Sequence, residues 1–210
     1  MRKSDIRACF VGDSFVHGVG DPECRGWVGR VLALGIQRGF PITGYNLGVR
    51  RNTSRDILGR WQRECAARLP PDSDCLIIFS FGVNDADVAN GIDDHETIEN
   101  CQKLLETAGK SYRIFLIGPP PVSDEVHNDR VGRLSVEFAA VAQRTGTPYL
   151  PVFAALTIDQ VWRKEVIAHD GDHPSAGGYI QLAHFVDRWS EWPFREKRSS
   201  KTLPEKGREH

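Results

Sequence analysis

The chain has 210 residues, of which 40% are hydrophobic, and domains most often contain about 100–200 residues, so one compact domain is expected. Its 27 Lys and Arg residues nearly balance its 28 Asp and Glu residues, which leaves a net charge of −1. This balance excludes the large basic field of proteins that bind nucleic acids or membrane surfaces non-specifically. The longest apolar runs, such as residues 76–79, are far shorter than the roughly 20 residues that cross a bilayer, so no transmembrane segment is predicted.

The first residues lead directly into a short apolar run and lack the long apolar stretch and cleavage site of a secretory signal. The protein is therefore predicted to be cytoplasmic. Its five cysteines are odd in number and show no Cys-x-x-Cys spacing. Neither a disulfide framework nor a thiolate zinc site is expected from this pattern.

Apolar runs of strand length alternate with amphipathic stretches along the chain. The predicted strands are residues 7–11, 43–47, 75–80, 113–117 and 148–153. The predicted helices are residues 27–37, 54–67, 97–108, 131–144 and 178–189, and Thr53 is a suitable N-cap for the second of them. This alternation predicts an α/β protein with a five-stranded parallel sheet covered by helices on both faces.

The composition changes near residue 195, after which charged residues and serines replace apolar residues. We therefore predict a single domain over residues 1–194 and a charged, flexible tail over residues 195–210. No internal repeat is apparent in the domain.

Candidate functional residues follow the ends of the predicted strands, where open parallel sheets bind their ligands. Ser14 follows the first strand, Gly48 the second and Asn84 the third. Asp170 and His173 lie farther along the chain, between the fifth strand and the last predicted helix. These five residues are expected to converge at one edge of the sheet.

These five residues have the side chains and backbone amides that an acyl-transfer reaction needs. A serine hydroxyl must lose a proton as it attacks, so Ser14 needs a neighbouring base, for which His173 is the best candidate. Asp170, three residues earlier, can hold the tautomer of His173 and stabilise its imidazolium form. The backbone amides of Ser14 and Gly48 and the side-chain amide of Asn84 are the predicted donors to an oxyanion.

Four sequence blocks carry a resemblance to a known superfamily: residues 12–15, residues 46–49 with Thr53 and Ser54, residues 82–85 and residues 170–174. In their order and spacing the chain resembles the SGNH or GDSL hydrolases, a superfamily of esterases and lipases. The resemblance extends from about residue 7 to residue 189. It implies a flavodoxin-like three-layer α/β/α fold, a Ser14 nucleophile, a His173 base oriented by Asp170, oxyanion donors at Ser14, Gly48 and Asn84, and no metal or organic cofactor.

One departure concerns the second block, where many members of the superfamily have a further glycine and this chain has Arg50 and Arg51. In one interpretation, an arginine reaches the mouth of the site and binds an anionic acyl group or a phosphate-bearing leaving group. In the other, which we favour on the sequence, the arginines are solvent-facing or structurally paired residues at a helix start.

The predicted function is hydrolysis of small-molecule carboxylic esters with small or medium acyl groups through an acyl-enzyme. The alternatives are a thioesterase or a carbohydrate O-deacetylase with the same triad, or a non-catalytic binding module on this fold. A dinucleotide site is excluded because Gly18 and Gly20 are not followed by a third glycine in the required position, and no Gly-Lys-Ser/Thr phosphate loop is present. The Gly-x-Ser-x-Gly elbow of α/β-hydrolases is excluded because Val16 occupies the place of its second glycine.

Overall fold

The computed structural model describes residues 5–195. Five parallel strands form one sheet in the order β2-β1-β3-β4-β5. The strands are β1 (Ile6–Gly12), β2 (Ile42–Gly48), β3 (Asp74–Ser80), β4 (Arg113–Ile117) and β5 (Tyr149–Leu150). Apart from Arg195, the predicted C-terminal tail lies outside the described residues, so its predicted flexibility stays a prediction.

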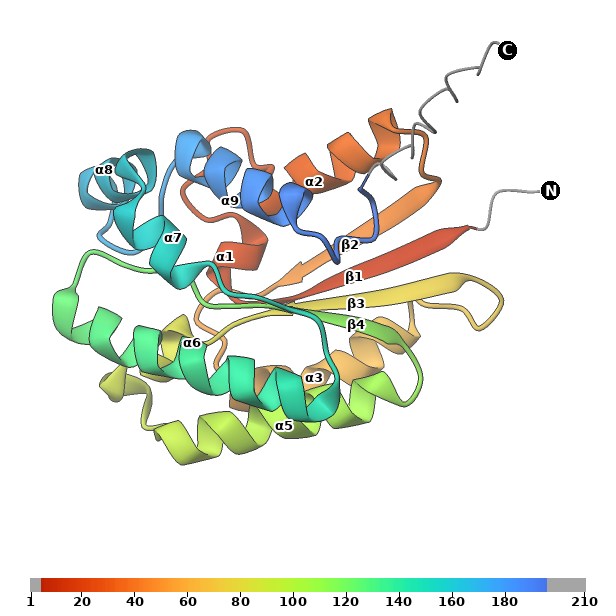
Figure 1. Ribbon diagram of the computed structural model, residues 1–210, viewed down its shortest axis with the longest axis horizontal. Coiled ribbons are helices and arrows are strands. Elements are labelled where there is room, and N and C mark those ends of the chain that lie inside the picture. Colours follow the sequence, from red (N-terminus) through yellow and green to blue (C-terminus); the bar gives the residue numbers. More distant parts are fainter. Residues whose placement is uncertain (1–4, 196–210) are drawn as a thin grey trace, which may run out of the picture.

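Helices cover both faces of the sheet (Figure 1). The helices are α1 (Ser14–His17), α2 (Gly26–Gln37), α3 (Ser54–Ala66), α4 (Val83–Ala86), the 3-10 turn η1 (Val88–Asn90), α5 (Asp94–Gly109), α6 (Glu125–Thr145), α7 (Phe153–Ile158), α8 (Gln160–Ala168) and α9 (Ala176–Arg188). Helices α2, α8 and α9 lie on one face, and α3, α5 and α6 lie on the other (Figure 1). The predicted three-layer α/β/α architecture is confirmed.

The first four predicted strands agree with the structure to within one residue at each end. The fifth does not, because strand β5 contains only Tyr149 and Leu150 and the chain enters α7 at Phe153. Pro151 follows β5 directly and has no backbone N–H to continue a ladder. The short helices α1 and α4 and the pair α7 and α8 were not predicted, since none is long enough to show a helical period clearly.

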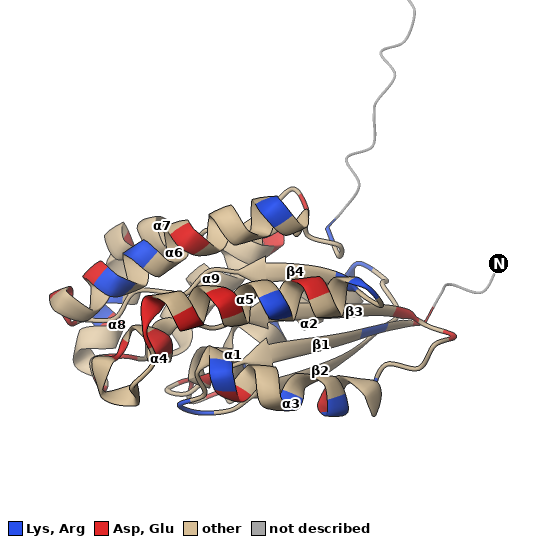
Figure 2. Cartoon of the chain, turned by 90° about the horizontal axis from the view of Figure 1, so that it is seen from below, with Lys and Arg blue, Asp and Glu red and all other residues tan. Residues whose placement is uncertain are grey.

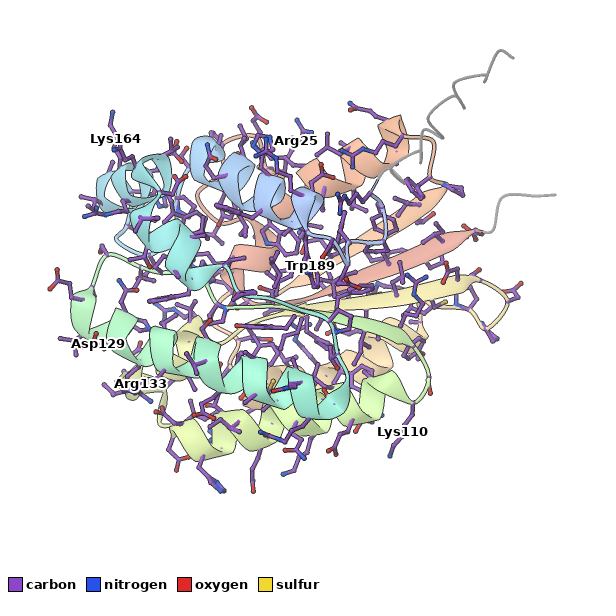
Figure 3. All side chains as sticks on the ribbon, in the orientation of Figure 1. Arg25, Lys110, Asp129, Arg133, Lys164 and Trp189 are labelled. Atoms are coloured by element: carbon purple, nitrogen blue, oxygen red, sulfur yellow. The ribbon has the colours of Figure 1, made fainter. Side chains whose placement is uncertain are left out.

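The sheet separates two hydrophobic clusters. Along β1, Ala8 and Phe10 face the cluster beneath α2 and α9, whereas Cys9 and Val11 face the cluster beneath α3 and α5. This alternation follows from the two-residue period of a strand. Trp189, at the end of α9, lies between that helix and the sheet (Figure 3) and packs edge-on against Phe115 of β4, with ring centroids 5.9 Å apart.

Charged residues of both signs are mixed on the surface. The charged residues of α5 are mostly acidic with a single lysine among them, and acidic and basic residues occur together on α3 (Figure 2). Within residues 5–195, no helix is long and apolar enough to cross a membrane. The same residues contain no group of His, Cys, Asp and Glu side chains arranged to hold a metal ion.

The strand order creates a switch point between β1 and β3, because the chain runs from β1 outward to β2 and then crosses to β3 on the other side. Ligands of this fold bind beyond the carboxyl ends of such strands. At the amino-terminal ends of the strands, opposite the switch point, Ile6 at the start of β1 lines the same hollow as Phe40 and Phe194. The described residues therefore start and end near the amino-terminal ends of the strands, away from the switch point.

Candidate active site

Ser14 is the first residue of α1, in the turn that follows β1. The preceding Asp13 caps this short helix, because its Oδ1 accepts a hydrogen bond of 2.9 Å from the Phe15 amide. Asp13 is thus a capping carboxylate at the helix N-terminus. The cap fixes Ser14 at the carboxyl edge of the sheet, with its amide at the N-terminus of α1.

Ser14, His173 and Asp170 form one hydrogen-bonded chain. The Nε2 atom of His173 lies 2.7 Å from Ser14 Oγ, and its Nδ1 atom lies 2.8 Å from Asp170 Oδ2. Ser14 is 3% exposed and His173 is 5% exposed. The fold thus brings together a serine and a histidine separated by 159 positions, in the arrangement that lets an imidazole remove a hydroxyl proton.

A tight turn between α8 and α9 orients Asp170 toward His173. Its Oδ1 accepts hydrogen bonds from the amides of Asp172, at 3.0 Å, and His173, at 2.8 Å, while Gly171 takes a φ of +87°. Partial burial by itself raises the pKa of Asp170, but the hydrogen bonds from the amide and ring of His173 and from Asp172 outweigh burial and lower it. Asp170 is consequently ionised at neutral pH and can stabilise an imidazolium at His173.

Aromatic rings fix the other side of the imidazole. Phe15 packs against His173 with ring centroids 4.8 Å apart, and Trp162 of α8 stacks on Phe15 at 6.2 Å. The indole Nε1 of Trp162 donates a 3.0 Å hydrogen bond to the Pro121 carbonyl oxygen. Trp162 is therefore a core residue, and it supports the ring next to Ser14.

A pocket of about 390 Å³ opens over Ser14 and His173. Asn84, the predicted oxyanion donor, lines it, and so do Arg50 and Arg51, as in the interpretation that places an arginine at the mouth of the site. Three further lining residues, Phe15, Val83 and Asp172, belong to the superfamily blocks, whereas the remaining ones lie outside them: Asp87, Ala89, Asn90 and His127. His127 comes from the first turn of α6, which begins at Glu125, six residues before the predicted helix, so no sequence signal placed it here.

Asn84 belongs to α4, which starts directly after Gly82. Gly82 has a φ of +119°, a conformation that glycine adopts at little cost. The Nδ2 of Asn84 donates a 2.9 Å hydrogen bond to the Asn52 carbonyl oxygen. An amide nitrogen carries two hydrogens, so the second N–H of Asn84 remains available to a bound substrate.

Gly48 differs from its predicted role. Its amide donates a 3.0 Å hydrogen bond to Asn46 Oδ1, and the residue is not part of the pocket wall. Gly48 instead allows close approach, since a Cβ there would overlap the backbone of His17 and Asp13. The absence of a side chain at Gly48 therefore serves the packing of β2 against the turn that carries the nucleophile.

Arg51 has the left-handed conformation that the superfamily's further glycine would adopt easily, with a φ of +66°. Both Arg50 and Arg51 are exposed. Within residues 5–195, neither side chain has an ion pair or hydrogen bond, and the Arg51 amide has no hydrogen-bond acceptor. Both arginines therefore face solvent at the rim of the pocket, and within the described chain neither is structurally paired.

His169 also contacts the carboxylate of Asp170. Its Nδ1 lies 3.2 Å from Asp170 Oδ1, whereas the ring of His173 lies against Oδ2. Only His173 reaches Ser14, however, because His169 is 43% exposed at the rim of the turn. The contact makes His169 a matched control for the function of His173.

Comparison with known proteins identifies the family. The sequence profile of the GDSL-like lipase/acylhydrolase family matches residues 10–180. The chain belongs to this family. As a GDSL-like acylhydrolase, it is an enzyme that hydrolyses esters. No curated relative matches the chain.

Solved structures with the same fold include acetylxylan esterase Axe2 from Geobacillus stearothermophilus, with a TM-score of 0.75 and 20% identity over 94% of this chain and all of that one. Another is a lipase/acylhydrolase from Enterococcus faecalis, with a TM-score of 0.69 and 22% identity over 86% of this chain and 92% of that one. Three further structures are of catalytic mutants of Axe2, in which a histidine, a serine or an aspartate is replaced by alanine. At these identities the likeness establishes the fold of this GDSL-like enzyme.

Proposed function

We propose that this enzyme is a serine ester hydrolase in which Ser14, His173 and Asp170 act as a catalytic triad. The observation that carries the proposal is the continuous hydrogen-bonded chain from Asp170 through His173 to Ser14, at the floor of an open pocket. The catalytic serine, aspartate and histidine mutants of Axe2 support the same three residue types.

The reaction proceeds in two halves. Ser14 Oγ attacks the acyl carbonyl carbon as its proton passes to His173 Nε2, and the tetrahedral intermediate collapses when His173 returns that proton to the leaving alcohol oxygen. Water then attacks the acyl-enzyme and gives a proton to His173. The acid departs as the Ser14 hydroxyl recovers this proton, so no net charge or proton is lost.

The oxyanion of each tetrahedral intermediate needs donors. We assign this role to the Ser14 backbone amide, at the N-terminus of α1, and to the free N–H of Asn84. The Gly48 amide is already bonded to Asn46. The Arg51 amide, which has no acceptor within the described chain and belongs to a residue of the pocket wall, is our candidate for the third donor.

The test is labelling of Ser14 with a fluorophosphonate, followed by peptide mapping. Labelling is expected at Ser14, to disappear in Ser14→Ala and to fall sharply in His173→Ala. Ester turnover should drop by about 10³-fold or more in both variants, because members of a triad act as a unit. His169→Ala is the control and should retain most activity; a folded wild-type protein that is not labelled contradicts the proposal.

For substrate class, we infer that Arg50 and Arg51 favour esters with a carboxylate or phosphate group. The left-handed backbone conformation of a non-glycine residue such as Arg51 costs about 1 kcal/mol of folding free energy. The Arg51 side chain makes no contact in the described chain that would offset this cost, so we assign it to substrate binding. Asp87 and Asp172 also line the pocket. The preference therefore depends on local contacts with the two guanidinium groups and not on a positive pocket as a whole.

Arg51→Gly tests this inference cleanly, because glycine keeps the backbone amide and relieves the strained φ. Its kcat/KM for a neutral acetyl ester should stay within about threefold of wild type, whereas that for a matched anionic ester should fall by about 10-fold or more, as for a lost charge-assisted hydrogen bond. Arg50→Ala is measured in parallel. Equal losses on both esters would remove the anion preference.

A carbohydrate O-deacetylase is the second candidate function. The fold shared with an acetylxylan esterase and the polar pocket wall, which includes Asp87, Asn90 and Asp172, favour a hydroxyl-rich leaving group. A panel of an acetylated xylo-oligosaccharide, an acetyl thioester and p-nitrophenyl esters of two to eight acyl carbons would rank these classes by kcat/KM. Preference for the oligosaccharide over p-nitrophenyl acetate supports the deacetylase.

A further inference from the structure

Arg60 of α3 lies behind the candidate oxyanion site, and its guanidinium group joins three segments of the chain. Its Nη2 donates hydrogen bonds to the carbonyl oxygens of Gly12, at 2.9 Å, and Leu47, at 3.0 Å. Its Nε donates to Asn52 Oδ1 at 2.6 Å, and its Nη1 pairs with Glu64 at 2.7 Å. One side chain thus holds the carboxyl ends of β1 and β2 and the loop before α3.

This group connects to the oxyanion donors through Asn52. The side chain of Asn52 accepts from Arg60, and its carbonyl oxygen accepts from Asn84 Nδ2 at 2.9 Å. The bond to Asn52 uses one N–H of Asn84 and so sets the direction of the other. Arg60 also acts through its bond to the Gly12 carbonyl oxygen. Gly12 lies two residues before Ser14, so this bond anchors the start of the turn that carries Ser14.

The environment of Arg60 suits this task. Its side chain is 14% exposed, and Glu64 on the same helix supplies the opposite charge. A planar guanidinium can serve several acceptors in fixed directions, whereas a lysine ammonium is a flexible point charge that cannot reproduce them all. Loss of Arg60 would also remove a donor from each of its acceptors, and the Gly12 carbonyl oxygen would keep only its 3.0 Å bond from the Val49 amide among the loop contacts.

We propose that Arg60 is a positioning residue that holds the Asn84 amide and the Ser14 turn in the geometry required by the transition state. The inference rests on the proposed hydrolase function, because it assigns Arg60 to the oxyanion donors of that reaction. Arg60 does not line the pocket. It acts through Asn52 and Gly12 and makes no contact with substrate.

The experiment compares Arg60→Gln and Arg60→Lys with Arg63→Gln, an exposed arginine on the same helix. Loss of groups that orient active-site residues costs about 10–100-fold, and we expect Arg60→Gln to lower kcat for a neutral acetyl ester by this factor with KM within about twofold of wild type. Arg60→Lys should recover only part of the loss. Arg63→Gln should match wild type.

A double-mutant cycle with Asn84→Ala separates positioning from general destabilisation. If Arg60 acts through Asn84, Arg60→Gln should cost much less in the Asn84→Ala background than in wild type. A reversible boronic acid inhibitor gives a second readout, since it mimics the tetrahedral state: its affinity should weaken in Arg60→Gln roughly in proportion to kcat. Assays are made well below the Tm of each variant.

The outcomes are distinct. Additive effects of Arg60→Gln and Asn84→Ala, or a fall in activity that only follows the unfolded fraction, would overturn the positioning role and leave the triad intact. Unchanged kcat in folded Arg60→Gln would overturn it as well. Absence of fluorophosphonate labelling at Ser14 in wild type would instead reject the proposed function on which the inference rests.

Discussion

The carboxyl group of Asp13 lies next to the nucleophile and is 1% exposed. Its Oδ1 caps α1, but within the described part of the chain its Oδ2 has no hydrogen-bond partner. Burial raises the pKa of Asp13 to about 7, against a smaller opposing effect of the Phe15 amide, and the nearby Asp85 raises it further. Asp85 is itself buried, and burial raises its pKa despite hydrogen bonds from Ser54 and Thr97.

The raised pKa of Asp13 predicts a pH-dependent stability. Between the unfolded value of 3.8 and the folded value of about 7, the native state binds more protons at Asp13 than the unfolded state, so stability falls as pH rises through this window. Asparagine keeps the capping oxygen and does not titrate. Asp13→Asn should therefore show a smaller decrease in Tm between pH 4.5 and pH 7.5, measured by circular dichroism.

Two observations check this prediction. Asp72→Asn, at an exposed position, should retain the slope of wild type, and part of the slope should persist in Asp13→Asn because the pKa of Asp85 is also raised. The lowered pKa of Asp170 acts in the opposite direction, since its stabilisation is lost as pH falls through its folded value. An identical slope in wild type and Asp13→Asn would show that Asp13 is ionised in the native state.

At the scale of elements, the contact between β2 and α1 depends on Gly48. Gly48 pairs in register with Gly12 of β1, and a Cβ on Gly48 would overlap the backbone of His17 and Asp13. Gly44, on the same strand, faces only the flexible end of the Leu32 side chain. The two glycines thus differ in what a methyl group would displace.

This contrast predicts different outcomes for two equivalent substitutions. Gly48→Ala should cost about 1–3 kcal/mol or more, as for overpacking against rigid atoms, which corresponds to a Tm lower by at least about 3 °C. Because the clash moves the Ser14 turn, kcat/KM should fall by about 10-fold or more. Gly44→Ala should change both little, and equal effects of the two substitutions would contradict this account.

At the scale of the whole molecule, apolar runs of strand length made the sheet predictable, and strand-end motifs made the convergence of Ser14, His173 and Asp170 predictable. Buried runs such as residues 75–80 can be read from local composition, and the superfamily blocks place Ser14, Asn84, Asp170 and His173 at strand ends or turns. Their convergence follows from parallel strand order, which carries all carboxyl ends to one edge.

The features of the site that the sequence did not predict depend on backbone geometry and on contacts between distant segments. The bond from the Gly48 amide to Asn46 and the φ of Arg51 arise from backbone geometry that composition does not encode. His127 reaches the pocket because α6 begins earlier than its apolar period. The four bonds of Arg60 join residues up to 48 positions apart, and no local pattern marks them.

The described chain starts and ends at the edge of the sheet opposite the pocket, where Ile6 and Phe194 lie close together. A carrier or solid support joined to the described part of the chain beside Ile6 or Phe194 would lie on the side of the sheet away from Ser14, so the mouth of the pocket would stay uncovered.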